Sequence, residues 1–222
     1  MTRQSGSRID SYEILDVLGQ GAFGVTYLVR DTTLDLQFAL KEYFPSGLAQ
    51  RAADGSVRPV AGAQDAFQQG LKRFLAEGRT LARLDHPNLA RVLRHFEEQG
   101  TAFLLMPRYA GRTLHQLLVR DGSFSPEELD ALMTPLLDAL AYLEQRGVVH
   151  GDIKPSNIMI SNSGSPVLLD FGAARVLDAA IDDEVGAAGS EGYAAIEQYR
   201  KPARVGPATD IYGLAATLYR LI

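Results

Sequence analysis

The period of the hydrophobic pattern changes near residue 106 of this 222-residue chain, and this change constrains the fold more than any single motif does. Before it, short runs of alternating apolar and polar residues predict β-strands. After it, apolar residues recur every three or four positions, which predicts helices. We therefore expect an α+β fold, with a β-rich N-terminal lobe over residues 1–106 and an α-rich C-terminal lobe over residues 107–222. A ligand site is expected in a cleft between the lobes.

The individual elements follow from this pattern and from the turn residues between them. Strands are expected over residues 12–18, 23–30, 36–42, 89–97 and 101–106, and a helix over residues 65–84. Residues 43–64 are irregular and rich in small residues, which predicts an inserted loop or hairpin. A second helix is expected to begin at a capping box, in which Ser125 and Glu128 flank a proline at position 126.

Composition excludes several classes of function. Hydrophobic residues make up 46% and charged residues 22% of the chain, a balance typical of a soluble globular protein. A formal net charge of -5 provides no basic field for nucleic acid or for an anionic membrane surface. Cysteine is absent, so a metal would be held by oxygen atoms or histidines, and Mg²⁺ fits oxygen ligands best. Residues 1–10 are polar and no apolar run reaches membrane-spanning length, so we expect a cytoplasmic location.

A glycine-rich segment lies between the first two predicted strands. It consists of Gly19, Gln20, Gly21, Ala22, Phe23 and Gly24. A dinucleotide-binding fingerprint would run from a strand into a helix, whereas this segment joins two strands. Glycines in such a hairpin let backbone N–H groups approach phosphate oxygens closely. The segment therefore predicts a phosphate-covering hairpin, and an ordinary glycine-rich hairpin is the alternative.

Lys41 and Glu77 form a candidate ion pair. Lys41 lies on the third predicted strand, among residues expected to be buried. Glu77 follows Phe74 by three positions and precedes Leu81 by four, so it shares the apolar face of the predicted helix. A buried carboxylate needs a partner, and Lys41 is suited to pair with it while holding ATP phosphates. The alternative is that both side chains reach solvent.

Three polar residues with complementary chemistry lie within the six positions from 152 to 157. Asp152 is a candidate acceptor for the proton of a substrate hydroxyl, Lys154 for neutralising a transferring phosphoryl group, and Asn157 for binding Mg²⁺. Alone, they are also compatible with a polar turn. Asp170 directly follows an apolar strand and is a second candidate ligand for Mg²⁺. His150 is expected to pack in the core.

Taken together, these motifs resemble the eukaryotic-like protein kinases, specifically the bacterial serine/threonine kinases, over residues 12–222. The matching segments are the glycine-rich segment, Ala39-Leu40-Lys41, Glu77, His86-Pro87-Asn88, residues 152–157, Asp170-Phe171-Gly172, and Ser190-Glu191-Gly192-Tyr193 leading to Glu197. The resemblance implies a two-lobed protein-kinase fold, with an antiparallel sheet and one helix in the N-lobe and a mainly helical C-lobe. It also implies transfer of the γ-phosphoryl group of Mg-ATP to serine or threonine hydroxyls of a protein substrate.

The same resemblance implies contacts with nucleotide and substrate. Besides the glycine-rich segment and Lys41, the residues implied to contact ATP are Thr26, Ala39, Met106, Pro107, Tyr109 and Met159. Met106 would be the gatekeeper, and the backbone at positions 107 and 109 would meet adenine. Lys154 follows Asp152 by two positions, as in the serine/threonine subclass, and Ser190 would line the substrate site.

Several features depart from the pattern of the family. Gly151 replaces an arginine that pairs with a phosphorylated activation segment in many kinases, so activity is not expected to require phosphorylation there. Ala195 replaces a proline, and Pro107-Arg108 is an unusual hinge. The chain stops at Ile222 within a predicted helix, so we expect an incomplete C-terminal lobe.

The last residues predict an exposed apolar surface. Leu214, Leu218, Leu221 and Ile222 recur at helical spacings, and Tyr212 and Tyr219 add aromatic surface. We expect them to form a patch that favours association, and we expect Glu197 to lack a partner. On this interpretation the chain is a fragment of a longer protein.

Two other functions stay open at this point. A pseudokinase-like scaffold would bind nucleotide or a protein partner without chemistry. A small-molecule phosphotransferase of the aminoglycoside or choline kinase type shares the His-Gly-Asp sequence found at positions 150–152. All charged residues needed for phosphoryl transfer are present, which favours an enzyme, and the segments at 171–172 and 192–197 favour a protein substrate.

Overall fold

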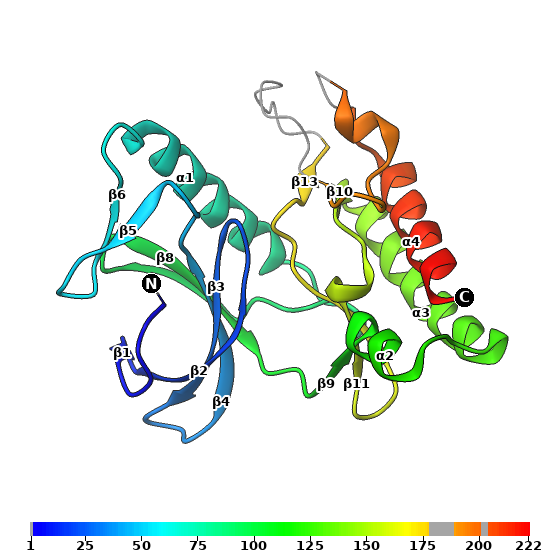
Figure 1. The fold of residues 1–222 in the computed structure, drawn as a ribbon, viewed down its shortest axis with the longest axis horizontal. Coiled ribbons are helices and arrows are strands. Elements are labelled where there is room, and N and C mark those ends of the chain that lie inside the picture. Colours follow the sequence, from blue (N-terminus) through cyan, green and yellow to red (C-terminus); the bar gives the residue numbers. More distant parts are fainter. Residues whose placement is uncertain (1, 178–188, 201–203) are drawn as a thin grey trace. The chain divides into compact units, whose positions relative to one another are not determined.

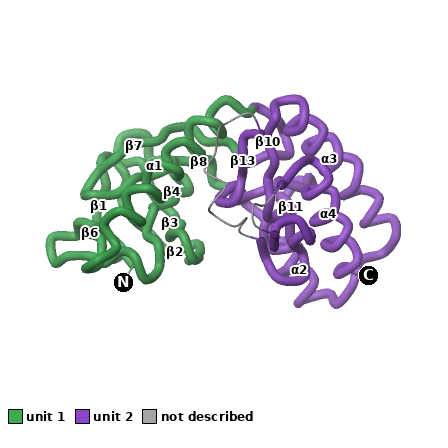
Figure 2. The backbone as a smooth tube through the Cα atoms, turned by 90° about the horizontal axis from the view of Figure 1, so that it is seen from above, with its two compact units in different colours: residues 1–84, 91–108 green, residues 85–90, 109–222 purple. Residues whose placement is uncertain are grey.

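The structure, a computed structural model, describes residues 2–177, 189–200 and 204–222. Its backbone groups into two compact units (Figure 2). The first unit contains residues 1–84 and 91–108, and the second contains residues 85–90 and 109–222.

An antiparallel sheet of six strands forms the first unit, in the order β1-β2-β3-β4-β8-β7 (Figure 1). Its strands are β1 (Arg8–Ile9), β2 (Tyr12–Gln20), β3 (Gly24–Asp31), β4 (Gln37–Tyr43), β7 (Arg94–Glu98) and β8 (Thr101–Pro107). Apolar and polar residues alternate along its strands, so one face is buried. In β3, for example, Val25, Tyr27 and Val29 are buried and point to the same face. The antiparallel sheet expected from the sequence is confirmed, and β1 is an additional edge strand.

The irregular segment after β4 folds as a hairpin. β5 (Ala49–Arg51) pairs antiparallel with β6 (Val57–Pro59). The turn between them contains Gly55, whose positive φ of 83° suits glycine. The backbone N–H of Val57 donates to the backbone oxygen of Gln99 at 2.7 Å, so the hairpin is attached to the β7–β8 turn. Of the loop and the hairpin predicted for residues 43–64, the structure has the hairpin.

A single helix, α1 (Gln64–Leu81), covers one face of the sheet in the first unit. The expected apolar stripe is its buried face, because Phe67, Leu71, Phe74 and Leu81 are all buried. The Tyr43 ring of β4 packs 5.3 Å from the Phe67 ring and 5.5 Å from the Phe74 ring, between centroids. Close packing here depends on Gly70, where a Cβ would collide with the Tyr43 hydroxyl and ring.

Gly70→Ala is expected to destabilise the protein, although alanine favours a helix over glycine by about 1 kcal/mol. Overpacking a well-filled site costs about 1–3 kcal/mol, so we expect a net loss of about 1–2 kcal/mol in the free energy of unfolding. Urea denaturation measures it. Gln69→Ala, on the exposed side of the same helix, is the control and should change stability by less than about 0.5 kcal/mol. A Gly70→Ala protein as stable as the control would show that α1 can move away from Tyr43.

The second unit is mainly helical in its described part. Its α-helices are α2 (Leu114–Asp121), α3 (Pro126–Gln145) and α4 (Pro207–Leu221), and its 3-10 helices are η1 (Pro155–Asn157) and η2 (Ile196–Tyr199). Its short strands are β9 (Gly111–Thr113), β10 (Val148–Val149), β11 (Ile158–Ser161), β12 (Pro166–Leu168) and β13 (Arg175–Val176). β12, β11 and β9 form one small sheet, and β10 pairs with β13. α4 packs against α3, and both contact β10.

Capping boxes begin the first two helices of this unit. The predicted box of α3 is present, because the backbone N–H of Glu128 donates to Ser125 Oγ at 3.2 Å and that of Ser125 donates to Glu128 Oε2 at 2.8 Å. A box of the same kind begins α2, with Thr113 and Gln116 as partners. The Thr-x-x-Gln spacing was a usable signal for α2, which the sequence analysis did not delimit.

The strand predicted over residues 89–97 is partly wrong. In the structure β7 begins at Arg94. Leu89 instead forms an isolated bridge with Leu168, and the backbone N–H of Ala90 donates to the backbone oxygen of Leu168 at 2.8 Å. The predicted strand therefore spans two units: residues 89–90 belong to the second and residues 91–97 to the first. The apolar pattern indicates that residues in both parts are buried, but not that these parts belong to different units.

Candidate active site

The glycine-rich segment forms the turn of the β2–β3 hairpin in the first unit. It runs through Gly19, Gln20, Gly21, Ala22, Phe23 and Gly24. The backbone N–H of Gly21 donates to the oxygen of Gly24 at 2.9 Å, which closes the turn. A Cβ on Gly24 would collide with the backbone oxygen of Glu42, so glycine lets β3 approach β4 closely at this point. At Gly19 and Gly21 the space beside the backbone is open, as the binding of a phosphate would require.

The side chains of Lys41 and Glu77 meet within the first unit. Lys41 Nζ lies 3.9 Å from Glu77 Oε1, and each side chain is 13% exposed. Lys41 Nζ also lies 5.9 Å from the centroid of the Phe74 ring. Gly78, next to Glu77, allows the Leu104 side chain to pack against the helix, because a Cβ there would collide with a Leu104 methyl group. The helix can thus approach β8 closely enough for Glu77 to reach Lys41.

The residues implied to contact adenine are divided between the units. Thr26 pairs with Lys41 across β3 and β4, and Ala39 pairs with Met106 across β4 and β8. Those implied residues that belong to the first unit are Thr26, Ala39, Met106 and Pro107, and those that belong to the second are Tyr109 and Met159. Met159 lies on β11. Strand pairing holds all of these residues except Tyr109, which lies between β8 and β9.

In the second unit, Asp152 is the centre of a compact polar cluster. Its Oδ1 accepts a hydrogen bond from Ser190 Oγ at 2.7 Å, and its Oδ2 accepts from Lys154 Nζ at 2.7 Å. Lys154 Nζ also donates to Ser190 Oγ at 2.5 Å. Asn157 Nδ2 donates to both the backbone oxygen and Oδ2 of Asp152, at 2.8 and 3.1 Å. The structure therefore brings three of the predicted residues, Ser190, Lys154 and Asn157, together around the carboxylate of a fourth, Asp152.

Asn157 and Asp170 provide oxygen ligands that suit Mg²⁺. Asn157 donates through its amide nitrogen, so its Oδ1 is the atom that would face a cation. The backbone N–H of Leu169 donates to the backbone oxygen of Asn157 at 2.7 Å, which brings Asp170 into the neighbourhood of Asn157. Asp170 has a positive φ of 55°, an uncommon conformation for a residue other than glycine. The chemistry of this pair fits the predicted metal.

His150 is structural, as expected. It is 0% exposed, and its ring lies 4.6 Å from the Phe171 ring, between centroids. Its Nδ1 accepts from the backbone N–H of Asp152 at 3.2 Å, which leaves Nε2 to donate to the backbone oxygen of Leu169 at 3.0 Å. The ring therefore joins the segment of Asp152 to the segment that leads to Asp170.

Asp210, in the first turn of α4, binds the backbone of the segment that leads to Asp152. This residue was not predicted from the sequence. Its Oδ2 and Oδ1 accept the backbone N–H groups of His150 and Gly151, both at 2.8 Å. Burial raises the pKa of the Asp210 carboxyl, while the His150 side chain and the two N–H groups act in the opposite direction. A carboxylate at the start of an apolar helix was the available signal, but its partners lie about 60 positions away in sequence.

The presence of glycine at position 151, where many kinases have arginine, is explained by the backbone conformation. Gly151 has a positive φ of 76°, and a Cβ there would lie 3.0 Å from the backbone oxygen of Ala173. Its own backbone oxygen accepts from Gln198 Nε2 at 2.8 Å. A larger side chain at this position would therefore be strained.

The expectation that Glu197 lacks a partner is wrong. Its Oε1 accepts a hydrogen bond from Thr209 Oγ1 at 2.7 Å. The expected apolar patch also needs correction, because Leu214 and Leu221 are buried at 3% and 0% exposure, in a unit where α4 packs against α3. Among the residues expected in the patch, Tyr212, Tyr219 and Ile222 are exposed, and Ile211 adds further exposed apolar surface.

Within residues 2–177, 189–200 and 204–222, no group of three or more His, Cys, Asp and Glu side chains is arranged to hold a metal. The helices over these same ranges include none with the length and apolar character needed to cross a membrane.

Comparison with known families identifies the fold. The protein kinase domain matches residues 12–222 of the chain. The chain belongs to this family. The resemblance seen in the sequence and the expected kinase fold are both confirmed.

Similar proteins agree with this assignment. The chain is 32% identical over 222 residues to "Serine/threonine-protein kinase PrkC" of Bacillus subtilis. The aligned region covers 98% of the chain and 31% of that protein. It is 35% identical over 156 residues to "Serine/threonine-protein kinase PknL" of Mycobacterium tuberculosis, which covers 70% of the chain and 39% of that protein. The chain thus spans about a third of the length of these relatives.

A solved structure gives the same fold. The chain is similar to "PpkA-294 apo form", with a TM-score of 0.86 and 40% sequence identity, over 100% of this chain and 78% of that one. This likeness extends over both units of the kinase domain.

Proposed function

We propose that this kinase domain transfers the γ-phosphoryl group of Mg-ATP to serine or threonine hydroxyls of a protein substrate. The first unit would hold ATP through the glycine-rich hairpin and Lys41, with Glu77 orienting Lys41. The second unit would supply Asp152 as the base and Asn157 and Asp170 as ligands of Mg²⁺. When bound, Mg²⁺ would neutralise charge on the β- and γ-phosphates.

The observation that carries this proposal is the hydrogen bond from the Ser190 hydroxyl to Asp152. The alcohol oxygen Ser190 Oγ lies 2.7 Å from Asp152 Oδ1. The Lys154 ammonium lies 2.5 Å from Ser190 Oγ. Asp152 is therefore within the distance at which a carboxylate can accept a hydroxyl proton. Lys154 lies beside it, where it would stabilise the negative charge of the transferring group. Ser190 would line the substrate site.

Support for the serine/threonine subclass comes from two sources. Lys154 contacts Asp152 at 2.7 Å, two residues along the chain, which is the spacing associated with that subclass. The similar curated proteins are named serine/threonine-protein kinases. Both observations favour an alcohol on a protein over a phenol or a small molecule.

Incubation of the purified protein with Mg²⁺ and γ-labelled ATP tests the proposal. Serine, threonine and tyrosine peptides would be offered in parallel with an aminoglycoside and choline. Label is expected on the serine or threonine peptides, and Asp170→Asn should lose it, because an amide lacks the charge that a Mg²⁺ ligand supplies. Label on the small molecules would favour the other phosphotransferase class. Tight nucleotide binding without any transfer would favour the scaffold.

A further inference from the structure

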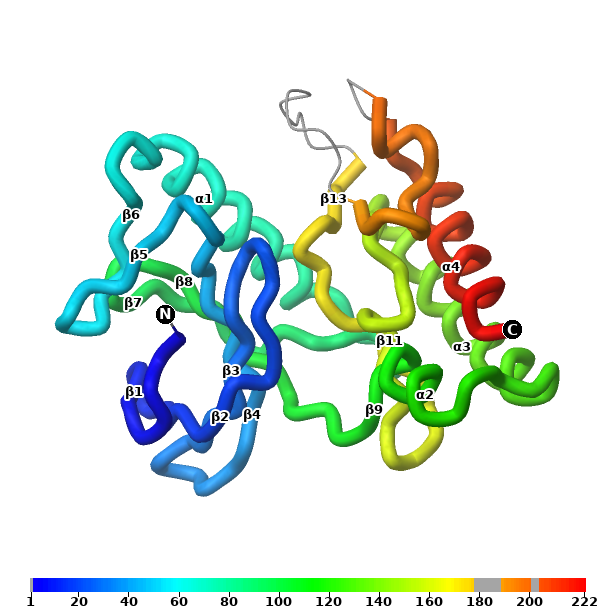
Figure 3. Tube along the Cα trace, in the orientation of Figure 1, coloured from blue at the N-terminus to red at the C-terminus, as the bar shows by residue number. Residues whose placement is uncertain are grey.

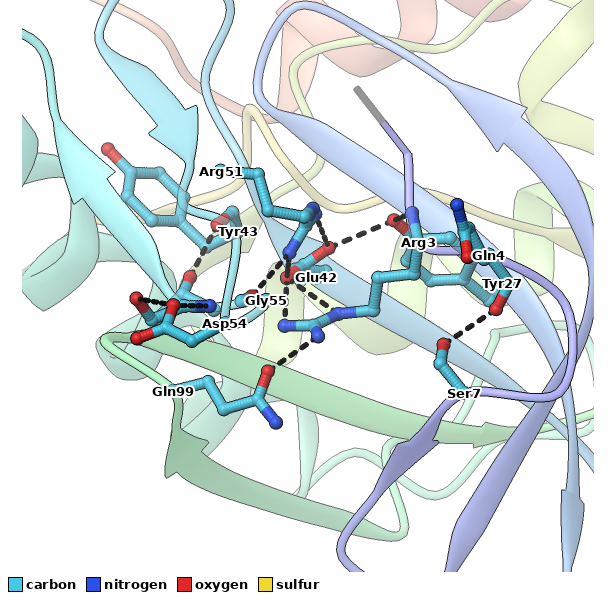
Figure 4. A network of polar contacts seen from close by, with 12 residues as sticks. Arg3, Gln4, Ser7, Tyr27, Glu42, Tyr43, Arg51, Asp54, Gly55 and Gln99 are labelled. Atoms are coloured by element: carbon cyan, nitrogen blue, oxygen red, sulfur yellow. Dashed lines mark hydrogen bonds and ion pairs between the residues drawn. The ribbon is translucent and has the colours of Figure 1, made fainter.

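Glu42 is a fully buried carboxylate beside Lys41 on β4. It is 0% exposed, and side chains alternate along a strand, so Glu42 and Lys41 point to opposite faces of the sheet. Figure 4 shows its partners. Arg3 donates to Oε1 through Nε at 3.0 Å and Nη2 at 2.7 Å. Arg51 donates to Oε1 at 3.1 Å and to Oε2 at 2.7 Å, and the Tyr27 hydroxyl donates to Oε2 at 3.0 Å.

The two arginines come from separate segments of the first unit. Arg3 precedes β1, and its side chain is 4% exposed. Arg51 lies on β5 of the β5–β6 hairpin, and its side chain is 10% exposed. Arg3 Nη1 also donates to Gln99 Oε1 in the β7–β8 turn at 2.7 Å, and its guanidinium lies 5.3 Å from the Phe103 ring centroid. Burial lowers the pKa of Arg3, and Glu42 opposes that effect.

The segment that carries Arg3 is also bound to β2. We call residues 3–7 the N-terminal strap (Figure 3). The backbone N–H of Gly6 donates to the oxygen of Ile14 at 2.8 Å, and the N–H of Ile14 donates back to the oxygen of Ser7 at 2.8 Å. Ser5 Oγ donates to the oxygen of Leu15 at 2.9 Å. β2 continues into the glycine-rich hairpin, so the strap connects the strand of that hairpin with the strand of Lys41.

The buried charge of Glu42 makes its contacts with the two arginines important for stability. A carboxylate removed from water is very costly unless it is paired and hydrogen-bonded, so Glu42 depends on the arginines that reach it. Arg3 lies outside the residues that match the kinase family, which begin at 12. The strap therefore adds a restraint from outside the matched residues.

We propose that the N-terminal strap, through Arg3 and Glu42, is a positioning element for nucleotide binding that fixes β2, the strand of the glycine-rich hairpin, relative to β4, the strand of Lys41. The nucleotide readout of this inference rests on the proposed function. Arg3 and Glu42 touch no substrate, and they act through the strands that carry the phosphate-binding groups. Loss of Arg3 should loosen the hairpin even in the absence of nucleotide.

Arg3→Met in the full chain tests this proposal. Arg94→Met is the matched control. Arg94 also pairs with an acidic residue near the N-terminus, Asp10, at 2.6 Å, but its side chain is about half exposed. Hydrogen exchange without ligand is expected to be about tenfold faster at the hairpin amides around Gly21 in Arg3→Met, and unchanged in the control. The Kd for Mg-ATP, measured by calorimetry, should rise by about tenfold, a size typical of energetic coupling between separate sites. The KM for peptide should stay unchanged.

A merely structural role would give a different result. It would lower kcat in proportion to the folded fraction and leave both the ATP affinity and the hairpin exchange of the folded protein unchanged, and that outcome would overturn the proposal. If Arg3→Met does not fold, Ser5→Ala removes one strap-to-β2 bond and should show a smaller shift in the same direction. Arg3→Lys, which keeps the charge, should recover part of the affinity. If the wild-type protein binds no nucleotide, the proposed function fails, and the exchange measurement still decides the role of the strap.

Discussion

Asp152→Asn is expected to lower kcat for peptide phosphorylation by about 10²–10⁴-fold, the usual contribution of a general base. The amide keeps the size of the side chain, and its oxygen can accept a hydrogen bond from Lys154 while its nitrogen donates to the Ser190 hydroxyl. It cannot take up the proton of a substrate hydroxyl. We therefore expect the KM for ATP to change little while kcat falls.

Steady-state kinetics with a serine peptide, on protein freed of contaminating kinases, measures this effect. Asp35→Asn is the matched control, because the Asp35 side chain is 83% exposed and pairs weakly with Arg30 at 3.5 Å. Its kinetics should equal those of the wild type. Both variants should give wild-type circular dichroism spectra. An Asp152→Asn protein with wild-type turnover would show that another group accepts the proton.

Lys41→Met is expected to lower kcat/KM by about 10²–10³-fold, as the loss of one preorganised donor to a charged transition state does in other enzymes. Methionine fills a similar volume without the ammonium, so the packing against Phe74 is retained. The lost function is the positioning of phosphates. Kinetics at several ATP concentrations separate the effect on KM from that on kcat.

Lys72→Met, on the exposed side of α1, is the control for a lost lysine and should leave the kinetics unchanged. A double variant tests the role of Glu77. If Glu77 acts by orienting Lys41, Glu77→Gln alone should lower activity, and adding it to Lys41→Met should cost nothing further. Full additivity of the two effects would show that Glu77 acts independently of Lys41.

Much of the candidate site was predictable because its signals are local. The polar residues from 152 to 157 lie on one short segment, so the turn geometry alone brings Asp152, Lys154 and Asn157 close together. The spacing of Glu77 within its apolar stripe predicted that it faces the sheet, and Lys41 is the cation it reaches. The family resemblance then supplied Ser190, which no local pattern connects to Asp152.

Other contacts were not predictable, because their partners are distant in sequence. Asp210 binds the backbone beside Asp152 from about 60 positions away. Glu197 was expected to be unpaired, yet the Thr209 hydroxyl reaches it once α4 begins at Pro207. Hydrophobic periodicity shows that such a carboxylate is near the interior, but it does not show which donor is there.

The kinds of elements, the faces they bury and the order of the phosphoryl-transfer motifs follow from local sequence, because each depends on residues within one or two turns or strands of each other. What covers those faces depends on long-range packing. Glu42 looks like any polar residue in a strand pattern, and only the fold brings Arg3 and Arg51 to it from 39 and 9 positions away. Burial of a charge requires a partner, but which segment supplies that partner depends on long-range packing that no local pattern encodes.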